Sequence, residues 1–289
     1  MPRLIINADD LGLTSGVNRA IEEAGRVGAI TSATLMASSP QFEEAVAIAH
    51  TVPELKIGCH IVLIDGEPLS SHVPSLTNGA ARFRSSLKDF ALAATRKRIM
   101  QDEIQREAET QIRKIQSAGL VVTHVDTHKH THMFPHVLRP VLKAAQACGV
   151  SAIRNPFERF RAWPGAAVIS TPALWIRALE VALLLKYASD FSRIVREEGL
   201  STTEGAVGVI ATGKLDQPLL LRTIQALPEG TWELVCHPGY VDAALAASGT
   251  RLRASRQIEL QALTSEETRN ALTKRGVELI SYEDLALGS

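Results

Sequence analysis

Two adjacent carboxylates, Asp9 and Asp10, stand in the segment NADDLG, directly after a short apolar run. Neighbouring carboxylates repel each other unless a cation or a shared proton relieves the repulsion, so the pair indicates the edge of a metal site. In an extended chain the two side chains point to opposite sides, which would let one bind metal while the other moves protons. The alternative is that one of them caps the helix that follows.

A run of histidines lies further on, in the segment THVDTHKHTHMF. Side chains two positions apart on a strand share a face, so His124, Asp126 and His128 are expected to point the same way. His130 and His132 join them if the chain stays extended. Burying such a polar face costs free energy, so a metal site is expected here rather than an exposed histidine-rich loop. Three protein ligands are usual in a catalytic site, so not all five residues can bind the metal.

Two further histidines become candidates for the same site only because the first two motifs are present. His60 stands in IGCHIVL, and a histidine among apolar strand residues is more often a hydrogen-bonded core residue than a ligand. His237 leaves a strand through the turn of CHPGY, which suits either the mouth of a barrel or a bond to the backbone. Taken together, the four motifs predict one site.

The elements that must position these side chains alternate between short β-rich runs and longer helical patterns, which predicts βα units and a parallel sheet. The expected strands are Leu4–Asn7, Ser32–Ala37, Lys56–Leu63, Val121–Thr127, Ala152–Asn155, Ala206–Ala211, Trp232–Cys236 and Val277–Ile280. The expected helices are Ser15–Val27, Gln41–His50, Ile99–Ala118, Pro135–Cys148, Pro172–Tyr187, Gln217–Gln225 and Glu266–Lys274.

Seven or eight such units predict one α/β domain over residues 1–289, a TIM-like (β/α) barrel, either regular or distorted. No GxGxxG follows the first strand, which argues against a dinucleotide site on an open sheet. Two segments interrupt the alternation of strands and helices: a long loop over Asp65–Leu87 and a helical insertion around residues 157–203.

Composition narrows the choice of partners. Lys plus Arg and Asp plus Glu both total 31, so no net basic charge is available to attract nucleic acid. No apolar run approaches the ~20 residues that span a bilayer, and the N-terminus does not resemble a signal peptide, so a cytoplasmic protein is expected. Cys59, Cys148 and Cys236 lack CxxC spacing, which predicts structural thiols.

Several charged residues receive structural interpretations. The helix Ile99–Ala118 is expected to expose a charged face that includes Glu103 and Glu107. Arg256 and Glu259 are expected to pair on a scaffold helix. Three arginines near FERFR are expected either to contact a sugar, an anion or lipid phosphates, or to be solvated: Arg154, Arg159 and Arg161.

With NADDLG, GCHIVL, THVDTHKHTHMF and ELVCHPG in this order, the chain resembles the YdjC-like carbohydrate deacetylases, which include chitooligosaccharide deacetylases. The resemblance covers nearly the whole length. The family motif GxHxxL is matched by Gly58, His60 and Leu63, and the motif close to THxDSHHHxHM is matched by the histidine run. Leu11 replaces an aromatic residue and Lys129 replaces a histidine, and neither change touches an expected ligand.

The resemblance implies removal of an N-acetyl group from an N-acetylglucosamine-type sugar. It implies one divalent ion, magnesium or zinc, held by Asp10, His60 and His128, with Asp9 as general base and His237 as acid or electrostatic partner. The chemistry is consistent, since a metal activates water and a protonated amine can leave. One carboxylate and two imidazoles suit zinc, while manganese and cobalt remain alternatives.

Within the family, the apolar helix over 172–187 and the overall length look similar to members associated with hopanoid biosynthesis, which are thought to deacetylate an N-acetylglucosaminyl hopanoid lipid. Its apolar side chains would bind the glycolipid or dock the enzyme on the inner membrane surface: Trp175, Leu179, Leu183 and Leu184. The alternatives are packing in the core or in a homodimer interface.

Three other functions compete with deacetylation. A phosphoesterase with an HxH site could use the same barrel, although such sites usually need more carboxylates for two or three ions. A non-catalytic carbohydrate or lipid binder would have little use for Asp9 beside Asp10. An isomerase would leave the acetyl group intact.

Overall fold

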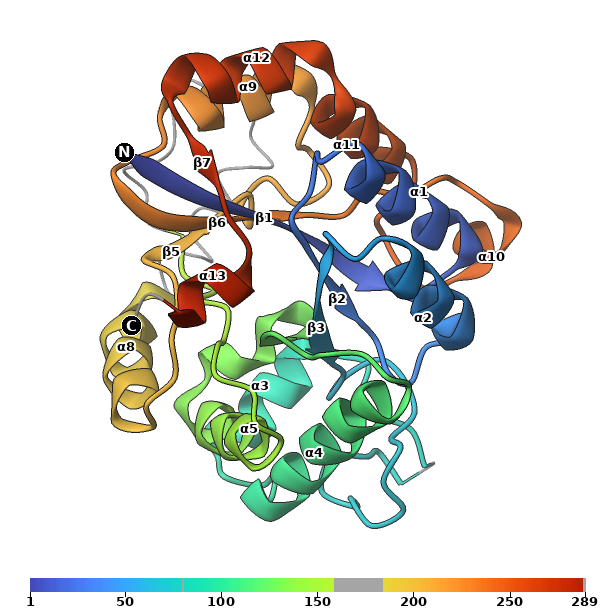
Figure 1. The fold of residues 1–289 in the computed structure, drawn as a ribbon. Coiled ribbons are helices and arrows are strands. Elements are labelled where there is room, and N and C mark those ends of the chain that lie inside the picture. The colour runs from blue at the N-terminus through green and yellow to red at the C-terminus, as the bar shows by residue number, and fades with distance from the viewer. Residues whose placement is uncertain (80, 159–183, 288–289) are drawn as a thin grey trace.

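The computed structural model describes residues 1–79, 81–158 and 184–287. Its centre is a sheet of parallel strands in the order β4-β3-β2-β1-β6-β5, with β7 paired to β1 (Figure 1). The strands are β1 Pro2–Leu11, β2 Ser32–Leu35, β3 Lys56–Ile61, β4 Val125–Thr127, β5 Gly205–Val207, β6 Gly230–Cys236 and β7 Glu278–Leu279. Because all pairings are parallel, the carboxyl ends of the strands lie at one edge of the sheet.

The sheet curls as a distorted (β/α) barrel, as the sequence predicts. Backbone hydrogen bonds continue from β4 to the segment Ala152–Arg154, because the Val125 amide donates to Ala152 and the Arg154 amide donates to Val125. Ile153 in turn donates to Ser201, just before β5. The predicted strand Ala152–Asn155 is therefore present only as isolated bridges, while the other seven predicted strands are confirmed with shifted ends.

Helices surround the sheet (Figure 1). They are α1 Ser15–Arg26, α2 Phe42–Thr51, α3 Leu87–Thr95, α4 Gln101–Ser117, α5 Pro135–Ala147, α8 Ala188–Glu197, α9 Gln217–Gln225, α10 Ala243–Ala247, α11 Ala254–Thr264, α12 Glu266–Arg275 and α13 Tyr282–Leu287, with 3₁₀ turns η1 His128–Met133 and η3 Leu185–Tyr187. Six of the seven predicted helices are confirmed within a few residues. Most of the seventh, Pro172–Tyr187, lies outside the described residues.

The central strand shows why the sequence folds this way. β1 is buried along nearly its whole length, as expected of a parallel strand covered on both faces. Leu4 and Ile6 belong to the main core, and Ile5 faces a smaller cluster with Tyr282. Each such side chain stabilises the fold by about 1.5–3 kcal/mol on burial. This packing fixes the end of β1, where the paired carboxylates stand.

The charged face predicted for α4 is partly wrong. Glu107 is fully buried and accepts hydrogen bonds from the backbone amides of Leu69 and Ser70, at 2.9 and 2.8 Å. Glu103 likewise accepts from the Ser75 amide at 2.7 Å. These carboxylates stay buried because they bind the otherwise unpaired amides of the long loop between β3 and α3. The loop prediction itself is confirmed up to Ser86, where α3 is capped.

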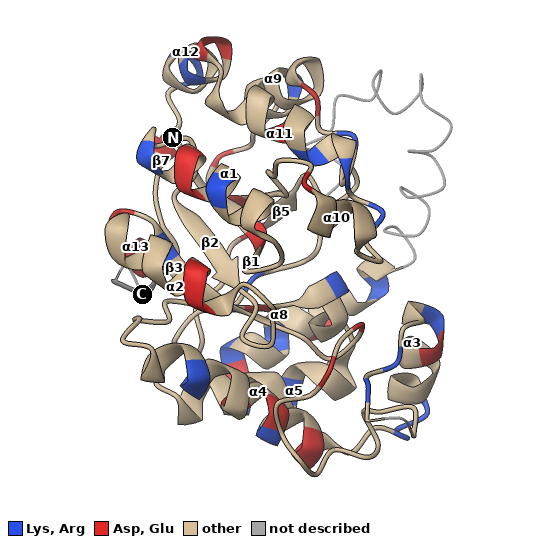
Figure 2. Ribbon diagram, turned by 90° about the vertical axis from the view of Figure 1, so that its right-hand side faces the viewer, with Lys and Arg blue, Asp and Glu red and all other residues tan. Residues whose placement is uncertain are grey.

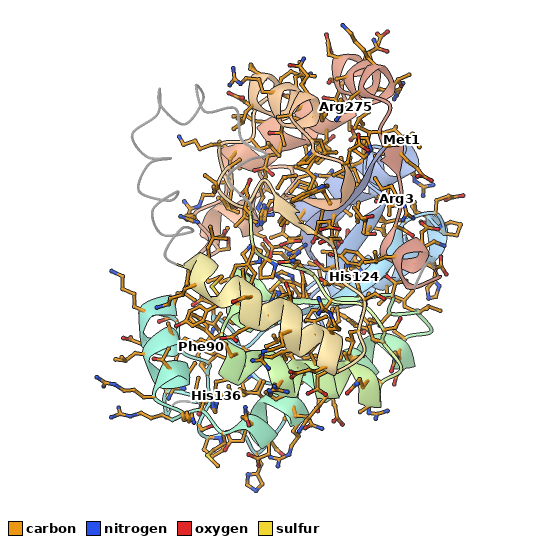
Figure 3. All side chains as sticks on the ribbon, turned by 90° about the vertical axis from the view of Figure 1, so that its left-hand side faces the viewer. Met1, Arg3, Phe90, His124, His136 and Arg275 are labelled. Atoms are coloured by element: carbon orange, nitrogen blue, oxygen red, sulfur yellow. The ribbon has the colours of Figure 1, made fainter. Side chains whose placement is uncertain are left out.

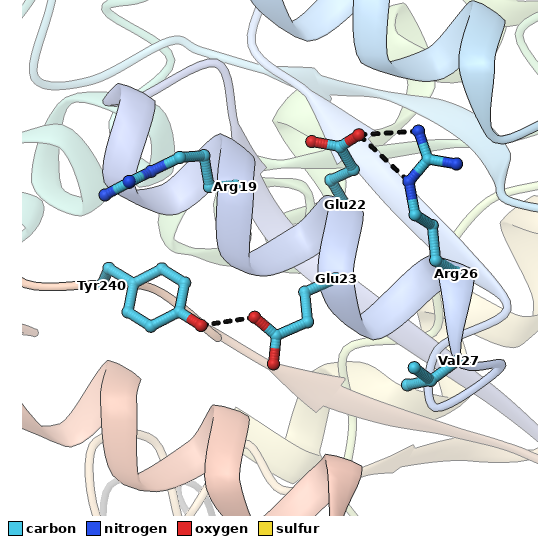
Figure 4. A pocket seen from close by; sticks show the side chains of 6 residues that line it. All are labelled: Arg19, Glu22, Glu23, Arg26, Val27 and Tyr240. Atoms are coloured by element: carbon cyan, nitrogen blue, oxygen red, sulfur yellow. Dashed lines mark hydrogen bonds and ion pairs between the residues drawn. The ribbon is translucent and has the colours of Figure 1, made fainter.

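The outer surface carries both signs of charge, spread over the helices (Figure 2). A shallow hollow on the outside of α1 is lined by residues of α1 with Tyr240, whose hydroxyl bonds to Glu23 (Figure 4). None of its lining residues belongs to the predicted site. Among the described helices, none has the length and apolarity needed to cross a membrane.

Some of the remaining predictions concern residues that the structure describes, and others concern residues outside the described ranges. The three cysteines are free and buried, which confirms the structural-thiol prediction. Most of the insertion around 157–203 lies outside the described residues, together with Arg159, Arg161, Trp175, Leu179 and Leu183. Leu184 is described and packs partly buried against the core.

Candidate metal centre and active site

The carboxyl ends of three strands bring the predicted ligands together. Asp10 stands at the end of β1, His60 in β3, and His128 directly after β4. Their ligand atoms form a nearly equilateral triangle. The Oδ1 atom of Asp10 lies 3.5 Å from His60 Nε2 and 3.5 Å from His128 Nδ1, and the two nitrogens are 3.2 Å apart.

This triangle has the size of a metal site. Ligands at about 2.0–2.1 Å from a tetrahedral ion are about 3.3 Å from one another, close to the three observed separations. The three ligand residues Asp10, His60 and His128 therefore form a group that could hold one divalent ion. A second group, Asp9, His60 and Asp126, shares the same histidine. A neutral imidazole has one nitrogen lone pair to give, so His60 can bind an ion in only one of the two groups.

The orientation of the His60 ring is explained by the contact of its other nitrogen, Nδ1, on the side away from Asp10 and His128. Its Nδ1 atom lies 2.7 Å from Asp126 Oδ1, its cross-strand partner in β4. Burial lowers the pKa of His60, but the charge and hydrogen bond of Asp126, with the charges of Asp9 and Asp10, raise it to about 9. A carboxylate on Nδ1 leaves Nε2 of the neutral ring free to bind metal. The carboxylates around His60 thus favour a positive charge at this position.

The backbone at Asp10 corrects one prediction. Asp10 has φ 67°, in the left-handed region that non-glycine residues rarely adopt, so the chain is not extended here. Asp9 and Asp10 therefore do not point to opposite sides: carboxylate oxygens of both lie within 4.8 Å of His60 nitrogens. Strain of this kind persists where the surrounding contacts hold it, as they do at functional sites.

Asp9 is held from two directions. Arg154 Nη2 donates to Asp9 Oδ1 at 2.6 Å, and Nη1 donates to Oδ2 at 2.8 Å. The side-chain Nδ2 of Asn7 also donates to Oδ1, at 2.9 Å. Burial raises the pKa of Asp9, but the charge and hydrogen bonds of Arg154 lower it further, to well below the usual range. Asp9 is therefore ionised and fixed.

Arg154 corrects a second prediction. It is fully buried rather than solvated or at a sugar-binding surface, and it also contacts Asp126 Oδ2 at 2.5 Å and Glu233 Oε1 at 2.7 Å. A planar guanidinium has five donors in a fixed fork, so it can bind both oxygens of one carboxylate and still reach two others, whereas a lysine has only three donors. Arg154 lies beneath the site and joins β1, β4 and β6.

The predicted pairing of Arg256 with Glu259 on a scaffold helix is also wrong. Both residues lie in α11 and are buried. Arg256 Nη2 donates to Asp10 Oδ2 at 2.5 Å, and Glu259 accepts from the backbone amide of His237 at 2.7 Å. Each side chain binds a different residue of the site because α11 packs over the ends of β1 and β6.

His237 lies beside the carboxylates. Its Nε2 atom is 3.8 Å from Asp9 Oδ2, and its Nδ1 atom is 3.9 Å from Glu259 Oε2. Burial lowers the pKa of His237 to about 4, although the charges of Asp9 and Asp10 act in the opposite direction. The structure thus brings the four predicted motifs to one place.

The histidine run does not stay extended. β4 ends at Thr127, and Lys129 and His130 have φ 55° and 53° inside the turn η1. His132 turns back, with Nδ1 at 2.7 Å from Thr127 Oγ1 and Nε2 at 3.1 Å from the Arg154 carbonyl. Of the alternating residues, only Asp126 and His128 contact His60.

Negative charge exceeds positive charge in this buried cluster. Five carboxylates face two guanidinium groups and the imidazole of His60, whose pKa is raised to about 9; the other residues are Asp9, Asp10, Asp126, Glu233 and Glu259, with Arg154 and Arg256. Burial raises the pKa of Glu259 to about 7, which relieves part of the excess. Buried uncompensated charge is costly, so the cluster favours a bound cation.

Sequence reasoning missed Glu233 altogether. It stands inside the apolar run of β6, is fully buried, and bonds to Arg154 and Tyr282. A lone carboxylate in a strand buried on both faces is the signal that could have identified it, since such a group needs a partner.

The fold and the site place the protein among (β/α) barrels that carry a candidate metal site at the carboxyl ends of their strands. Residues 3–274 match the family described as YdjC-like protein, and the chain belongs to this family. The predicted resemblance is confirmed.

The relatives and solved structures match over the whole length. Carbohydrate deacetylases of Brevibacillus brevis and Geobacillus stearothermophilus are 32% and 34% identical, covering 98% of this chain and 99% and 98% of the relatives. A crystal structure from Enterococcus faecalis V583, provisionally named a cellobiose-phosphate cleavage protein, has TM-score 0.75 and 27% identity, covering 99% of both chains. The lactam utilization protein of Thermus thermophilus, with TM-score 0.50 and 15% identity over 96% of this chain and 99% of that one, shares the fold alone.

Proposed function

We propose that this protein is a carbohydrate deacetylase that removes the N-acetyl group from an N-acetylglucosamine-type sugar, using one divalent ion bound by Asp10, His60 and His128. The observation that carries the proposal is the triangle of three ligand atoms, 3.2–3.5 Å apart, beside the fixed carboxylate of Asp9. The names of the Brevibacillus and Geobacillus relatives supply the reaction.

The residues around the triangle have complementary roles. A divalent ion bound there would supply a Lewis acid for the acetamide and its attacking water. Asp9 is ionised and takes the proton of the attacking water. Burial lowers the pKa of His237 to about 4 and its Nε2 lies 3.8 Å from Asp9, so it stabilises the oxyanion as a neutral donor or passes the proton taken by Asp9 to the leaving amine. Protonation matters because an amine leaves poorly as an anion.

The metal is proposed to be zinc or magnesium. One carboxylate and two imidazoles are ligands that zinc prefers, whereas a magnesium site would be completed by water. Adding each metal to chelated and dialysed protein and measuring the rate identifies the active one.

The deciding experiment measures acetate released from a panel of N-acetylglucosamine conjugates, with and without a chelator. We expect release that the chelator abolishes and a stoichiometric divalent metal restores. Release that is indifferent to chelation would refute the metal site, and no release from any conjugate would refute deacetylation.

The finer substrate proposal is the N-acetylglucosaminyl head group of a hopanoid lipid, met at the inner membrane surface of the cytoplasm. It rests on the apolar sequence over 172–187, most of which lies outside the described residues. Replacing apolar residues there with polar ones should slow reaction with a glycolipid and spare short soluble sugars. An equal loss on both substrates would instead favour a core or homodimer role.

The competing phosphoesterase and binding functions are separable from deacetylation. The two candidate ligand groups among the described residues share His60, which favours one ion over the two or three that phosphoesterases usually hold. Phosphate release from phosphorylated disaccharides, without acetate release, would establish the phosphoesterase. A pure binder would keep its function when Asp9 is replaced by asparagine.

A further inference from the structure

Tyr282 connects the C-terminal helix to the interior of the site. It is the first residue of α13, follows the last strand, and lies beyond residue 274, where the family match ends. The side chain is fully buried, and its hydroxyl donates a hydrogen bond to Glu233 Oε2 at 2.6 Å. Burial raises the pKa of Tyr282 well above its usual range, so the hydroxyl keeps its proton.

One line of contacts leads from this hydroxyl to Asp9 through charged groups. The other oxygen of Glu233 accepts from Arg154 Nε at 2.8 Å. The same guanidinium donates through Nη1 and Nη2 to both oxygens of Asp9. Glu233 therefore fixes one edge of the guanidinium whose other nitrogens hold the carboxylate of Asp9.

A second line leads to Asp9 through neutral groups. The ring of His124 stacks on the ring of Tyr282, with centroids 3.8 Å apart and planes inclined by 10°. His124 lies in the interior of the molecule (Figure 3). The ring of His124 has space because the neighbouring strand β3 has a glycine, Gly58, at this point. A Cβ at Gly58 would come within 2.4 Å of His124 Cε1.

Hydrogen bonds complete this second line. His124 Nε2 lies 3.1 Å from Asn7 Oδ1, and Asn7 Nδ2 donates to Asp9 Oδ1 at 2.9 Å. An ionised carboxylate only accepts hydrogen bonds, so the amide nitrogen of Asn7 faces Asp9 and its oxygen faces His124. His124 must therefore carry its proton on Nε2.

We propose that Tyr282 is a positioning residue, which fixes the carboxylate of Asp9 through Glu233 and Arg154 on one side and through His124 and Asn7 on the other. The inference rests on the proposed function, in which Asp9 takes a proton. It also gives His124 a role: it connects the Tyr282 ring to the amide that orients Asp9, and it binds no metal.

All residues of the two lines are buried, which explains why the distant hydroxyl of Tyr282 affects the position of Asp9. Apart from Asp9, which is 2% exposed, each residue on both lines has no exposed surface. Hydrogen bonds are stronger in such a medium, and a lost partner is not replaced by bulk water. A reacting group that moves by about 1 Å can lose about 100-fold in rate. Packing alone would not need the hydroxyl, since the apolar neighbours of Tyr282 are Ile5, Ala152 and Ile280.

The test is Tyr282→Phe, which keeps the ring and its stacking on His124 and removes only the hydroxyl. We expect kcat for acetate release to fall about tenfold, while KM and the affinity for added zinc stay within about twofold. Tyr282→Leu also removes the stacking and should lower kcat further. Wild-type kcat in folded Tyr282→Phe would overturn the proposal.

The control is Ile280→Val, which trims a neighbour in the same small cluster without touching either line. The melting temperature of each variant is measured alongside its kcat. An equal loss of kcat in Ile280→Val and Tyr282→Phe at equal melting temperature would mean a merely structural role and would overturn the proposal. Should Tyr282→Phe not fold, His124→Gln tests the second line, where a lowered kcat supports the proposal and an unchanged kcat overturns it.

These outcomes are separate from a failure of the proposed function. A wild-type protein that releases no acetate from any N-acetylated sugar refutes the deacetylase itself. An active wild type with an equally active Tyr282→Phe variant refutes only the positioning role.

Discussion

The Nδ1 atom of His60 lies 2.7 Å from Asp126 Oδ1, whereas the Nε2 atom of the same ring lies 3.5 Å from Asp10 Oδ1. Both sides of this buried imidazole therefore face carboxylates. Burial lowers the pKa of His60, but the charges of these carboxylates raise it to about 9, so without a metal the ring carries two protons. A cation that binds at Nε2 must displace one of these protons.

Metal binding should therefore release a proton. The pKa of metal-free His60 is about 9, so at pH 7.5 the ring is protonated and must lose one proton to become a ligand. We expect about one proton released per zinc ion, and an apparent affinity that rises about tenfold per pH unit below pH 9. Calorimetry in two buffers of different ionisation enthalpy measures the number. Zero released protons at pH 7.5 would contradict this arrangement.

Asp126 should control metal affinity without binding the metal. It accepts the Nδ1 proton of His60 and so orients the ring, and partners of this kind are typically worth 10- to 100-fold in affinity. Asp126→Asn should weaken zinc binding by about that factor, whereas Asp10→Asn should weaken it more. Competition with a chromophoric chelator measures both constants. Equal affinity in wild type and Asp126→Asn would remove Asp126 from this role.

The meeting of the four motifs was predictable because parallel strands end at one edge of a sheet. Asp10, His60 and His128 each stand at or near the end of an apolar strand, but their selection as the ligands came only from the resemblance to the YdjC-like family. Local backbone conformation was not predictable: nothing in NADDLG shows that Asp10 adopts φ 67° and brings Asp9 to the same side.

The partners of the carboxylates were harder to predict. Arg256 binds Asp10 across 246 positions of sequence, and Arg154 binds Asp9 across 145. Periodicity assigns such residues to helices or strands but does not say which distant strand end a helix will cover. The same limit hid Glu233, whose two partners come from segments on either side of β6 in sequence.

Replacing Asp9 by asparagine should separate binding from turnover. The side-chain oxygen of the asparagine could still accept from Arg154 but could not take a proton, so we expect kcat to fall by about 10²- to 10⁴-fold. Zinc content should stay close to one ion per chain, because Asp10, His60 and His128 are unchanged. Elemental analysis and an acetate assay on the same sample give both values. Parallel loss of metal and activity would mean that Asp9 is itself a ligand.

Removing Arg154 should destabilise the protein far more than removing an exposed arginine. Arg154→Met leaves Asp9, Asp126 and Glu233 without their shared cation in the interior. Breaking a buried ion pair by deleting one partner costs about 3–5 kcal/mol, because the remaining charge is uncompensated. Urea unfolding at pH 7.5, in the presence of excess chelator, measures the loss.

The matched control for this prediction is Arg139→Met, since Arg139 also contacts two carboxylates, Glu197 and Glu198, at 2.9 and 3.0 Å. Its side chain is 38% exposed, so water screens the interaction and the expected loss is below about 1 kcal/mol. The comparison isolates burial, because both variants make the same chemical change. Similar losses for the two would contradict the prediction. The Arg154→Met stability should recover as the pH is lowered, since protons then replace the missing cation.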